Sequence, residues 1–295
     1  MSVHARVIEE AVGGKSTVFL VGGIDTGKTS LARELLTAGL AAGRTGAYLD
    51  ADPGQKRVGP PTTVTAKLVR SLEDLEPARL AVEDVLAFVG STSPQGYLLQ
   101  LVTAIAQVAA AVRASGVSFV VVDTDGMVSG IYGQLLKVHE VEVLRPDLVL
   151  GLQRGEELLP LLGAIQRSFA TEVVPLPVMP GVRDTSVEER ADNREAAMRR
   201  YFSGELHRFR VKPTVFVPTL PPLFDLAQLD RLVVGLSDGA GACSGIGYLE
   251  HAPGEDLRLV TPVAAGPKAL RLGGVRLDGS YQARRVDLRN LFGSE

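Results

Sequence analysis

The sequence predicts a doubly wound α/β domain with a parallel sheet, followed by a small, mostly β C-terminal domain. Through the first two-thirds of the chain, short continuous apolar runs alternate with segments of helical period. Such runs are typical of parallel strands that are covered on both faces. Near residue 211 the pattern changes to short apolar stretches separated by glycine, aspartate and proline. We therefore expect a first domain over 1–211 and a second domain over 212–295.

The elements follow in order from these patterns. The runs that predict strands are 17–21, 47–49, 85–89, 117–122, 148–152 and 173–178. The segments with helical spacing are 29–40, 95–114 and 184–202. Alternation of strands with helices favours a parallel sheet with helices on both faces.

Composition excludes several classes of protein. The chain has 295 residues, of which 45% are hydrophobic and 22% charged, which is ordinary for a globular protein. Its single cysteine, Cys243, excludes an intramolecular disulfide and a metal site built from several thiolates. No apolar stretch approaches the roughly 20 residues that span a bilayer, and the N-terminus lacks the apolar region of a signal peptide. We expect a cytoplasmic protein with no membrane partner.

The net charge of −3 does not indicate a non-specific nucleic-acid binder. The charge is uneven, because basic residues outnumber acidic ones between residues 258 and 289. This run predicts either a local basic surface or an ordinary solvated face of a β domain.

A glycine-rich motif, G-x-x-x-x-G-K-T, stands between the first expected strand and the first expected helix. In that context it predicts a P-loop, whose backbone N–H groups and helix N-terminus bind phosphates. Lys28 would reach the β- and γ-phosphates, and Thr29 would offer its hydroxyl to Mg²⁺. A glycine-rich turn with a chance lysine is disfavoured because strand, motif and helix coincide. We expect the nucleotide to be bound by Gly22, Gly23, Ile24, Asp25, Thr26, Gly27, Lys28, Thr29 and Ser30.

Two acids, Asp50 and Asp52, follow the second apolar run. The C-terminal end of the strand beside a P-loop strand lies near the phosphates, and alternation sends both side chains to the same side. A kinase that phosphorylates a hydroxyl needs a carboxylate there to orient the hydroxyl and accept its proton. The two acids could share one Mg²⁺ and one acceptor, and the Pro-Gly turn after them would present Gln55. The alternative is that one acid caps a turn and the other is solvated.

A third acid, Asp123, ends the most apolar of the expected strands. A carboxylate at this position usually holds Mg²⁺, either directly or through water. Thr124 and Gly126 follow at once, so this loop could approach the bound nucleotide closely.

Four motifs in this order give a more specific identification: "GGIDTGKTS", "LDADPGQ", "GPPTTV" and "VVDTDGMVSGIYG". Together they resemble the Clp1/Grc3 family of polynucleotide 5′-hydroxyl kinases. The segment "SVEERADNREAAMRRYFSG" resembles the lid of that family, which implies a helical lid at about 183–204 in the first domain. The similarity runs from about residue 22 to 204. The C-terminal segment is similar to the C-terminal domain of the family more loosely. The P-loop alone would not distinguish this family from others.

The resemblance implies roles for individual residues. Asp52 would be the base that activates the 5′-hydroxyl of RNA or DNA, and Gln55 would contact the acceptor end. Residues 124–127 would form the clasp that holds phosphates and the terminal base. Arg190 and Arg194 would be the paired arginines of the lid. The cofactors would be ATP and Mg²⁺; the absence of a guanine-reading Asn-Lys-x-Asp loop also favours ATP.

The chain departs from the family pattern in two places. The clasp has Met127 where the family has tryptophan, and a thioether contacts a base less directionally than an indole does. The chain also begins about fifteen residues before its first expected strand, so we expect a short form without the N-terminal domain of larger members. Protein partners are left open for that reason.

The lid segment combines an apolar helix face with arginines. Val187, Ala191, Met198 and Phe202 share one helix face; Arg194 lies inside that stripe, and Arg190 lies at its edge. An arginine there would be costly against an apolar core, but favourable if the helix closed over an anion. We expect Arg194 to neutralise charge on the transferring group with help from Arg190. The alternative is that Arg194 extends along the helix with its head in water.

Lys56 and Arg57 follow the acidic motif directly, before the stiff Pro60–Pro61 pair. They would either bind the backbone phosphates of the acceptor strand or form an ordinary surface charge pair. The sequence thus predicts transfer of the ATP γ-phosphate to a nucleic-acid 5′-hydroxyl. Two alternatives stay open: an ATP-dependent binding or assembly factor that transfers nothing, and a small-molecule or nucleoside kinase.

Overall fold

The structure, a computed structural model, describes residues 3–179, 181–251 and 257–293. The chain divides into two compact units, which are treated separately below. The first unit comprises Met1–Asp52, Val64–Val85 and Leu101–Ser186, and the second comprises Pro53–Thr63, Leu86–Gln100 and Val187–Glu295. The domain boundary that the sequence suggests at 211/212 stays a prediction.

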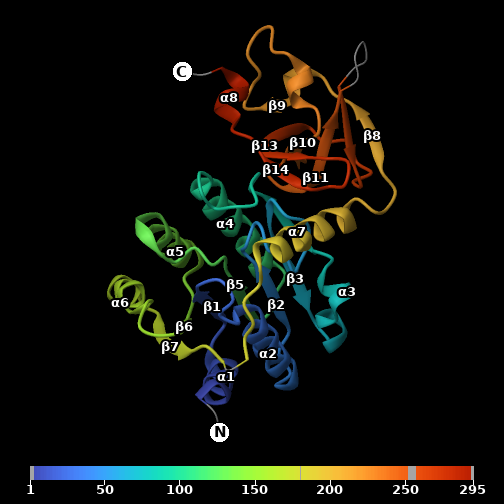
Figure 1. The fold of residues 1–295 in the computed structure, drawn as a ribbon. Coiled ribbons are helices and arrows are strands. Elements are labelled where there is room, and N and C mark those ends of the chain that lie inside the picture. The colour runs from blue at the N-terminus through green and yellow to red at the C-terminus, as the bar shows by residue number, and fades with distance from the viewer. Residues whose placement is uncertain (1–2, 180, 252–256, 294–295) are drawn as a thin grey trace. The chain divides into compact units, whose positions relative to one another are not determined.

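The first sheet has seven strands in the order β4-β3-β2-β5-β1-β6-β7. Its strands are β1 (Thr17–Gly22), β2 (Gly46–Asp50), β3 (Thr63–Val69), β4 (Val85–Phe88), β5 (Phe119–Asp123), β6 (Leu148–Gln153) and β7 (Glu172–Pro177). The central strands are buried along their length, as expected for apolar runs covered on both faces. The pairs β1–β5, β1–β6, β2–β5 and β6–β7 are all parallel. This confirms the predicted parallel sheet (Figure 1).

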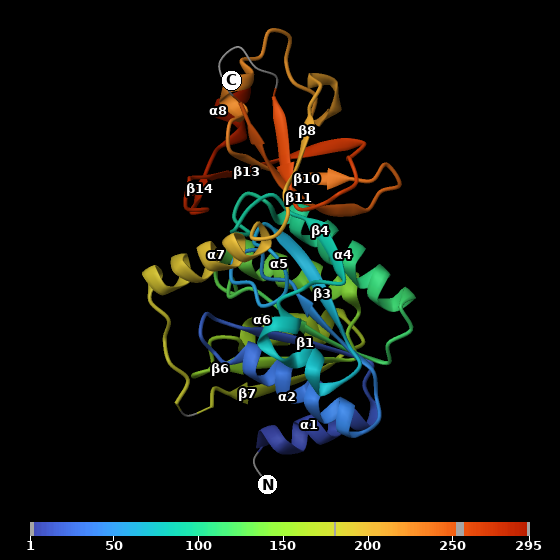
Figure 2. The same cartoon turned by 90° about the vertical axis from the view of Figure 1, so that its right-hand side faces the viewer.

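Helices cover both faces of this sheet. They are α1 (Val3–Gly14), α2 (Lys28–Ala41), α3 (Pro77–Leu80), α4 (Leu98–Ala114), α5 (Gly130–Leu144) and α6 (Leu159–Ser168), with a 3₁₀ turn at Leu72–Leu75. The α1 helix packs on α2, and α5 packs on α6. Right-handed crossovers in opposite directions along the sheet put α2 on one face and α5 and α6 on the other (Figures 1 and 2). The first unit is therefore doubly wound.

One strand departs from the parallel pattern. β3 is antiparallel to β2, with Asp50 opposite Thr65. The chain between the two strands forms no crossover helix, and it returns in the opposite direction. Consequently the Pro-Gly-Gln turn after Asp52 leads into a reversal of the chain at the edge where β2 ends.

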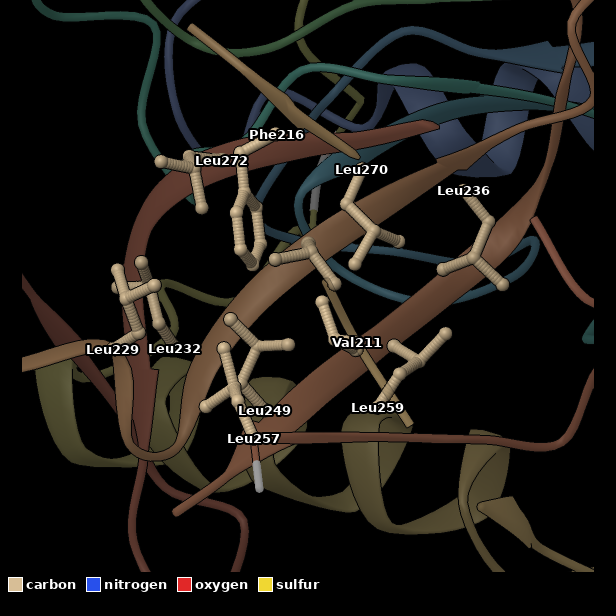
Figure 3. Packing of buried hydrophobic residues seen from close by; sticks show 11 residues of the cluster. Val211, Phe216, Leu229, Leu232, Leu236, Leu249, Leu257, Leu259, Leu270 and Leu272 are labelled. Atoms are coloured by element: carbon tan, nitrogen blue, oxygen red, sulfur yellow. The ribbon is translucent and has the colours of Figure 1, made fainter. Parts of the chain in front are cut away.

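The second unit is mostly β, as the sequence predicts. Its sheet has the order β14-β13-β10-β11-β12-β8, and β9 pairs with β13. Its strands are β8 (His207–Arg210), β9 (Phe216–Val217), β10 (Leu232–Ser237), β11 (Cys243–Glu250), β12 (Arg258–Thr261), β13 (Ala269–Leu277) and β14 (Ala283–Arg285). Its helical elements are α7 (Val187–Tyr201), α8 (Leu288–Phe292) and 3₁₀ turns at Pro213–Val215 and Leu226–Leu229. Buried side chains such as Leu232, Leu249 and Leu270 form one of its cores (Figure 3).

The helix that the sequence predicts as a lid is α7, which belongs to the second unit. Its C-terminal end is anchored by side chains: Met198, and Phe202 directly after the helix, pack with Val233, Ile246 and Tyr248 in a second core. Its N-terminal half is not, because Val187 is 67% exposed. The α7 helix is therefore anchored at one end by the sheet of its own unit.

No helix within the described ranges is both long and apolar enough to cross a membrane.

Candidate functional site

The glycine-rich motif forms a tight loop between β1 and α2. Gly27 has φ +88° and Asp25 has φ +52°, so the backbone turns twice through the left-handed region. Gly22 has no room for a side chain, because an added Cβ would lie 2.7 Å from the carbonyl oxygen of Leu152. The loop ends where α2 begins, at Lys28, and the positive end of that helix therefore lies at the loop. This is the local geometry that binds phosphate groups.

The lysine of the motif is held inside this loop. The Nζ atom of Lys28 donates to the carbonyl oxygens of Gly22 at 2.9 Å and Gly23 at 2.6 Å. Burial lowers the pKa of Lys28, while the nearby carboxylates of Asp123 and Asp52 act in the opposite direction. The ammonium group is thus within electrostatic reach of both acids.

Two hydroxyl groups converge on Asp123 at the end of β5. The Thr29 hydroxyl donates to Asp123 Oδ2 at 2.7 Å, and the Tyr48 hydroxyl donates to the same oxygen at 2.5 Å. Burial raises the pKa of Asp123, while Lys28 and the two hydroxyl groups oppose the shift. Burial, together with the charges of Asp123 and Asp50, raises the pKa of Tyr48. Tyr48 therefore stays a neutral donor.

Thr29, Asp50 and Asp123 are side chains of the kind that can hold a magnesium ion. In this part of the sheet Asp50 lies directly opposite Asp123 in the β2–β5 register, and both side chains are buried. A hydroxyl, one or two carboxylates, phosphate oxygens and water are the usual ligands of Mg²⁺ in a nucleotide site. Across the described residues, no group of three or more His, Cys, Asp or Glu side chains could hold a metal ion. Nucleotide and water oxygens would have to complete the coordination.

Asp52, the predicted base, follows β2 directly and is half-buried. Its backbone N–H donates to Asp50 Oδ1 at 3.3 Å. Burial is the leading cause of the pKa shifts of Lys28 and Asp123. The charge of Asp52 opposes the lowering of the Lys28 pKa and adds to the raising of the Asp123 pKa. The first unit therefore brings the P-loop lysine and the three predicted acids together at the carboxyl edge of β2 and β5.

Changing Tyr48 to phenylalanine tests the support of Asp123. We expect the free energy of unfolding to fall by about 1.5–3 kcal/mol, because the variant removes a hydrogen bond to a buried charged group. Urea denaturation monitored by circular dichroism measures this change. Tyr132→Phe is the matched control, since Tyr132 is 64% exposed and should unfold like the unaltered protein. Equal stability of both variants would contradict the importance of the Tyr48 hydroxyl.

The loop after β5 approaches the P-loop closely. The Thr124 hydroxyl donates to the carbonyl oxygen of Leu20 at 2.8 Å. A Cβ added to Gly126 would lie 2.6 Å from Ile24 Cγ1 and 2.8 Å from the Ile24 nitrogen. Only glycine fits there, so the two loops are in direct contact. Met127 follows, and its backbone N–H donates to Asp125 Oδ1 at 2.7 Å.

The other predicted residues belong to the second unit. Gln55 Nε2 donates to the backbone oxygen of Arg190 at 3.1 Å, which joins the turn after Asp52 to α7. Lys56 is buried, whereas Arg57 is exposed. Arg190 and Arg194 are half-buried on α7. The roles predicted for these residues stay predictions.

Two features of the first unit are absent from the sequence-based site. Tyr48 is one; it could have been found, because alternation along β2 puts it on the same side as Asp50. The other is a set of contacts made by Asp25, which the sequence predicts only as a nucleotide-binding residue: its side chain accepts hydrogen bonds from the Thr185 N–H at 2.7 Å and the Thr185 hydroxyl at 3.0 Å. Arg154 Nη2 adds a bond to the Asp25 carbonyl oxygen at 2.8 Å. No sequence pattern indicates these long-range contacts.

Comparison with known proteins gives a consistent result. The family model described as mRNA cleavage and polyadenylation factor CLP1 P-loop matches residues 22–204. The chain is 27% identical to a polyribonucleotide 5′-hydroxyl-kinase of Pyrococcus horikoshii, covering 89% of this chain and 88% of that protein. It is 30% identical to a protein of the same name from Methanocaldococcus jannaschii, covering 88% and 87%.

A solved structure supports the fold. The structure of a wild-type Clp1p–Pcf11p complex superposes with a TM-score of 0.72 at 16% identity. The match covers 93% of this chain and 78% of that one. At this identity the likeness concerns the fold alone, and it extends over both units.

Proposed function

The chain belongs to the CLP1 P-loop family, and on that premise we propose that it is an ATP-dependent polynucleotide 5′-hydroxyl kinase. The observation that carries the proposal is the gathering of Lys28, Thr29 and Asp123 with Asp52 at one edge of the first sheet. A nucleotide-binding protein needs the first three. A carboxylate beside them is what transfer to an alcohol requires in addition.

The reaction is an in-line displacement. The 5′-hydroxyl oxygen of the acceptor forms a bond to the γ-phosphorus of ATP, the bond to the β–γ bridging oxygen breaks, and ADP leaves. Asp52 orients the hydroxyl and accepts its proton. Thr29, Asp123 and Asp50 would hold Mg²⁺, which when bound would supply positive charge against the phosphate oxygens. Lys28 must leave the P-loop carbonyls to reach the β- and γ-phosphates.

The remaining residues fall into two groups. The backbone of residues 22–30, with Thr124 and Gly126, binds the triphosphate, while Gln55, Lys56, Arg57 and Met127 contact the acceptor. Arg194, assisted by Arg190, stabilises charge on the transferring phosphoryl group. Binding of an RNA 5′-end is favoured because the curated relatives carry the name polyribonucleotide 5′-hydroxyl-kinase. DNA remains a second acceptor to be tested.

A labelling assay tests the activity. The protein is incubated with Mg²⁺, ATP labelled at the γ-phosphate, and RNA or DNA oligonucleotides of equal sequence that carry a 5′-hydroxyl. We expect label on the oligonucleotide, and none on control oligonucleotides that already carry a 5′-phosphate. Intact ATP binding without label on either acceptor would refute the kinase proposal.

One observation favours a second candidate. The superposed structure is of a complex between Clp1p and a segment of Pcf11p, so a protein of this fold binds another protein. A nucleotide-dependent binding factor would use the same P-loop and α7 without transferring phosphate. It would bind ATP and leave the oligonucleotide unlabelled, so the same assay separates the two candidates.

A further inference from the structure

Three ionisable side chains are buried together behind the loop that follows β5. Lys137 Nζ lies 2.8 Å from Asp125 Oδ2 and 3.0 Å from Glu140 Oε2. The side chains of Lys137 and Glu140 are 0% exposed, and that of Asp125 is 5% exposed. Lys137 and Glu140 are one turn apart on α5, whereas Asp125 belongs to the loop between β5 and α5. The cluster therefore ties this loop to the helix that follows it.

Burying three charged side chains is an energetically unfavourable way to fill a protein core. Desolvating ions costs several kcal/mol for each, and well-packed apolar residues of similar volume are often as stable or more stable. Burial raises the pKa of Glu140 to about 7, even though Lys137 opposes the shift. Stability alone does not account for charged side chains at this place. The better explanation is that their contacts fix the position of the loop after β5.

The loop has two ends that are fixed by different contacts. Toward β1, the Thr124 hydroxyl bonds to Leu20, and Gly126 packs on Ile24 of the P-loop. Toward α5, Asp125 is the link: one carboxylate oxygen accepts from the Met127 N–H at 2.7 Å and the other from Lys137. The first set of contacts does not involve Lys137. Met127 is linked to Lys137 through Asp125.

We infer that Lys137 is a positioning residue, which acts through Asp125 to hold Met127 where the acceptor strand binds. This inference rests on the proposed function, which assigns Met127 to the acceptor and Thr124 and Gly126 to the nucleotide. The inference predicts a change in the affinity for the acceptor without a change in the affinity for ATP. Loss of the Lys137–Asp125 pair should loosen the acceptor end of the loop and leave the nucleotide end in place.

The test compares three variants of the full chain. Lys137→Met removes the cation, and Asp125→Asn breaks the pair while leaving Lys137 with Glu140, so that one variant keeps a charge partner if the other fails to fold. Glu140→Gln is the matched control: Glu140 is equally buried and accepts from the same lysine, and it belongs to α5 and not to the loop. The KM for a 5′-hydroxyl oligonucleotide, the Kd for ATP, and deuterium uptake of the peptide covering 124–129 are measured for each.

We expect Lys137→Met and Asp125→Asn to raise the KM for the oligonucleotide about tenfold or more, since small misplacements of a binding group have effects of that size. The Kd for ATP should change less than twofold, and deuterium uptake of residues 124–129 should rise. Glu140→Gln should show none of these changes. Unchanged deuterium uptake, or faster uptake with unchanged KM, would overturn the inference. If the unaltered protein labels no acceptor, the proposed function fails, and unchanged uptake would then reject the role of Lys137 separately.

Discussion

Replacing Asp52 with asparagine should lower kcat for phosphorylation of an oligonucleotide by about 10²- to 10⁴-fold, which is the usual contribution of a general base. The amide keeps the size of the side chain but cannot accept the proton of the 5′-hydroxyl. The Kd for ATP should stay nearly unchanged, because Asp52 is proposed to contact the acceptor and not the nucleotide. Steady-state labelling and equilibrium nucleotide binding measure the two quantities.

The control for this variant is Glu156→Gln, an equally conservative change of an exposed carboxylate. It should leave kcat and Kd as they are. A large loss of ATP binding in Asp52→Asn would assign Asp52 to the metal ion instead. Full activity of Asp52→Asn would remove the main argument for transfer to an alcohol.

Changing Arg194 to alanine should reduce kcat by about 10³-fold, near the lower end of the range for an arginine that stabilises the transition state of phosphoryl transfer. The Kd for ATP should change far less, since such an interaction strengthens only as the γ-phosphoryl group moves to the acceptor. Single-turnover labelling at saturating ATP measures the chemical step directly.

Arg200→Ala is the matched control, because Arg200 lies on the same helix and is exposed. Its kcat should equal that of the unaltered protein. Equal losses of kcat and of ATP affinity in Arg194→Ala would mean that Arg194 binds the nucleotide uniformly. A similar loss in Arg200→Ala would indicate a general disturbance of α7.

Most strands of the first sheet could be predicted, because the central ones, β2, β5 and β6, are apolar runs that are buried along their length. The carboxylates at the ends of β2 and β5 followed from the same prediction, since parallel strands bring their ends to one edge. The helix α5 was not predicted. Its buried face includes Lys137 and Glu140, and these charged residues hide the apolar period on which helix prediction depends.

The α1 helix and the β3 strand were missed for other reasons. The α1 helix buries only His4, Val7 and Ala11, so its apolar stripe is narrow. The β3 strand follows a segment rich in proline and glycine, which predicts a loop, and its antiparallel direction depends on the length of that segment. Contacts such as Tyr48 with Asp123 join residues far apart in sequence. They depend on the packing of particular side chains, which periodicity does not describe.

The burial of one end of α7 has a consequence for its motion. Phe202 stacks on Tyr281 with ring centroids 5.5 Å apart, and meets Tyr248 edge-on at 5.2 Å. Freeing this end of the helix would expose aromatic surface, so its backbone amides should exchange with solvent only when the surrounding β-strands also open. The arginines nearer the exposed end can shift only by pivoting on this fixed point or by carrying the β-sheet with them. Any such movement would then be a collective motion, which is slower than the fluctuation of a loop.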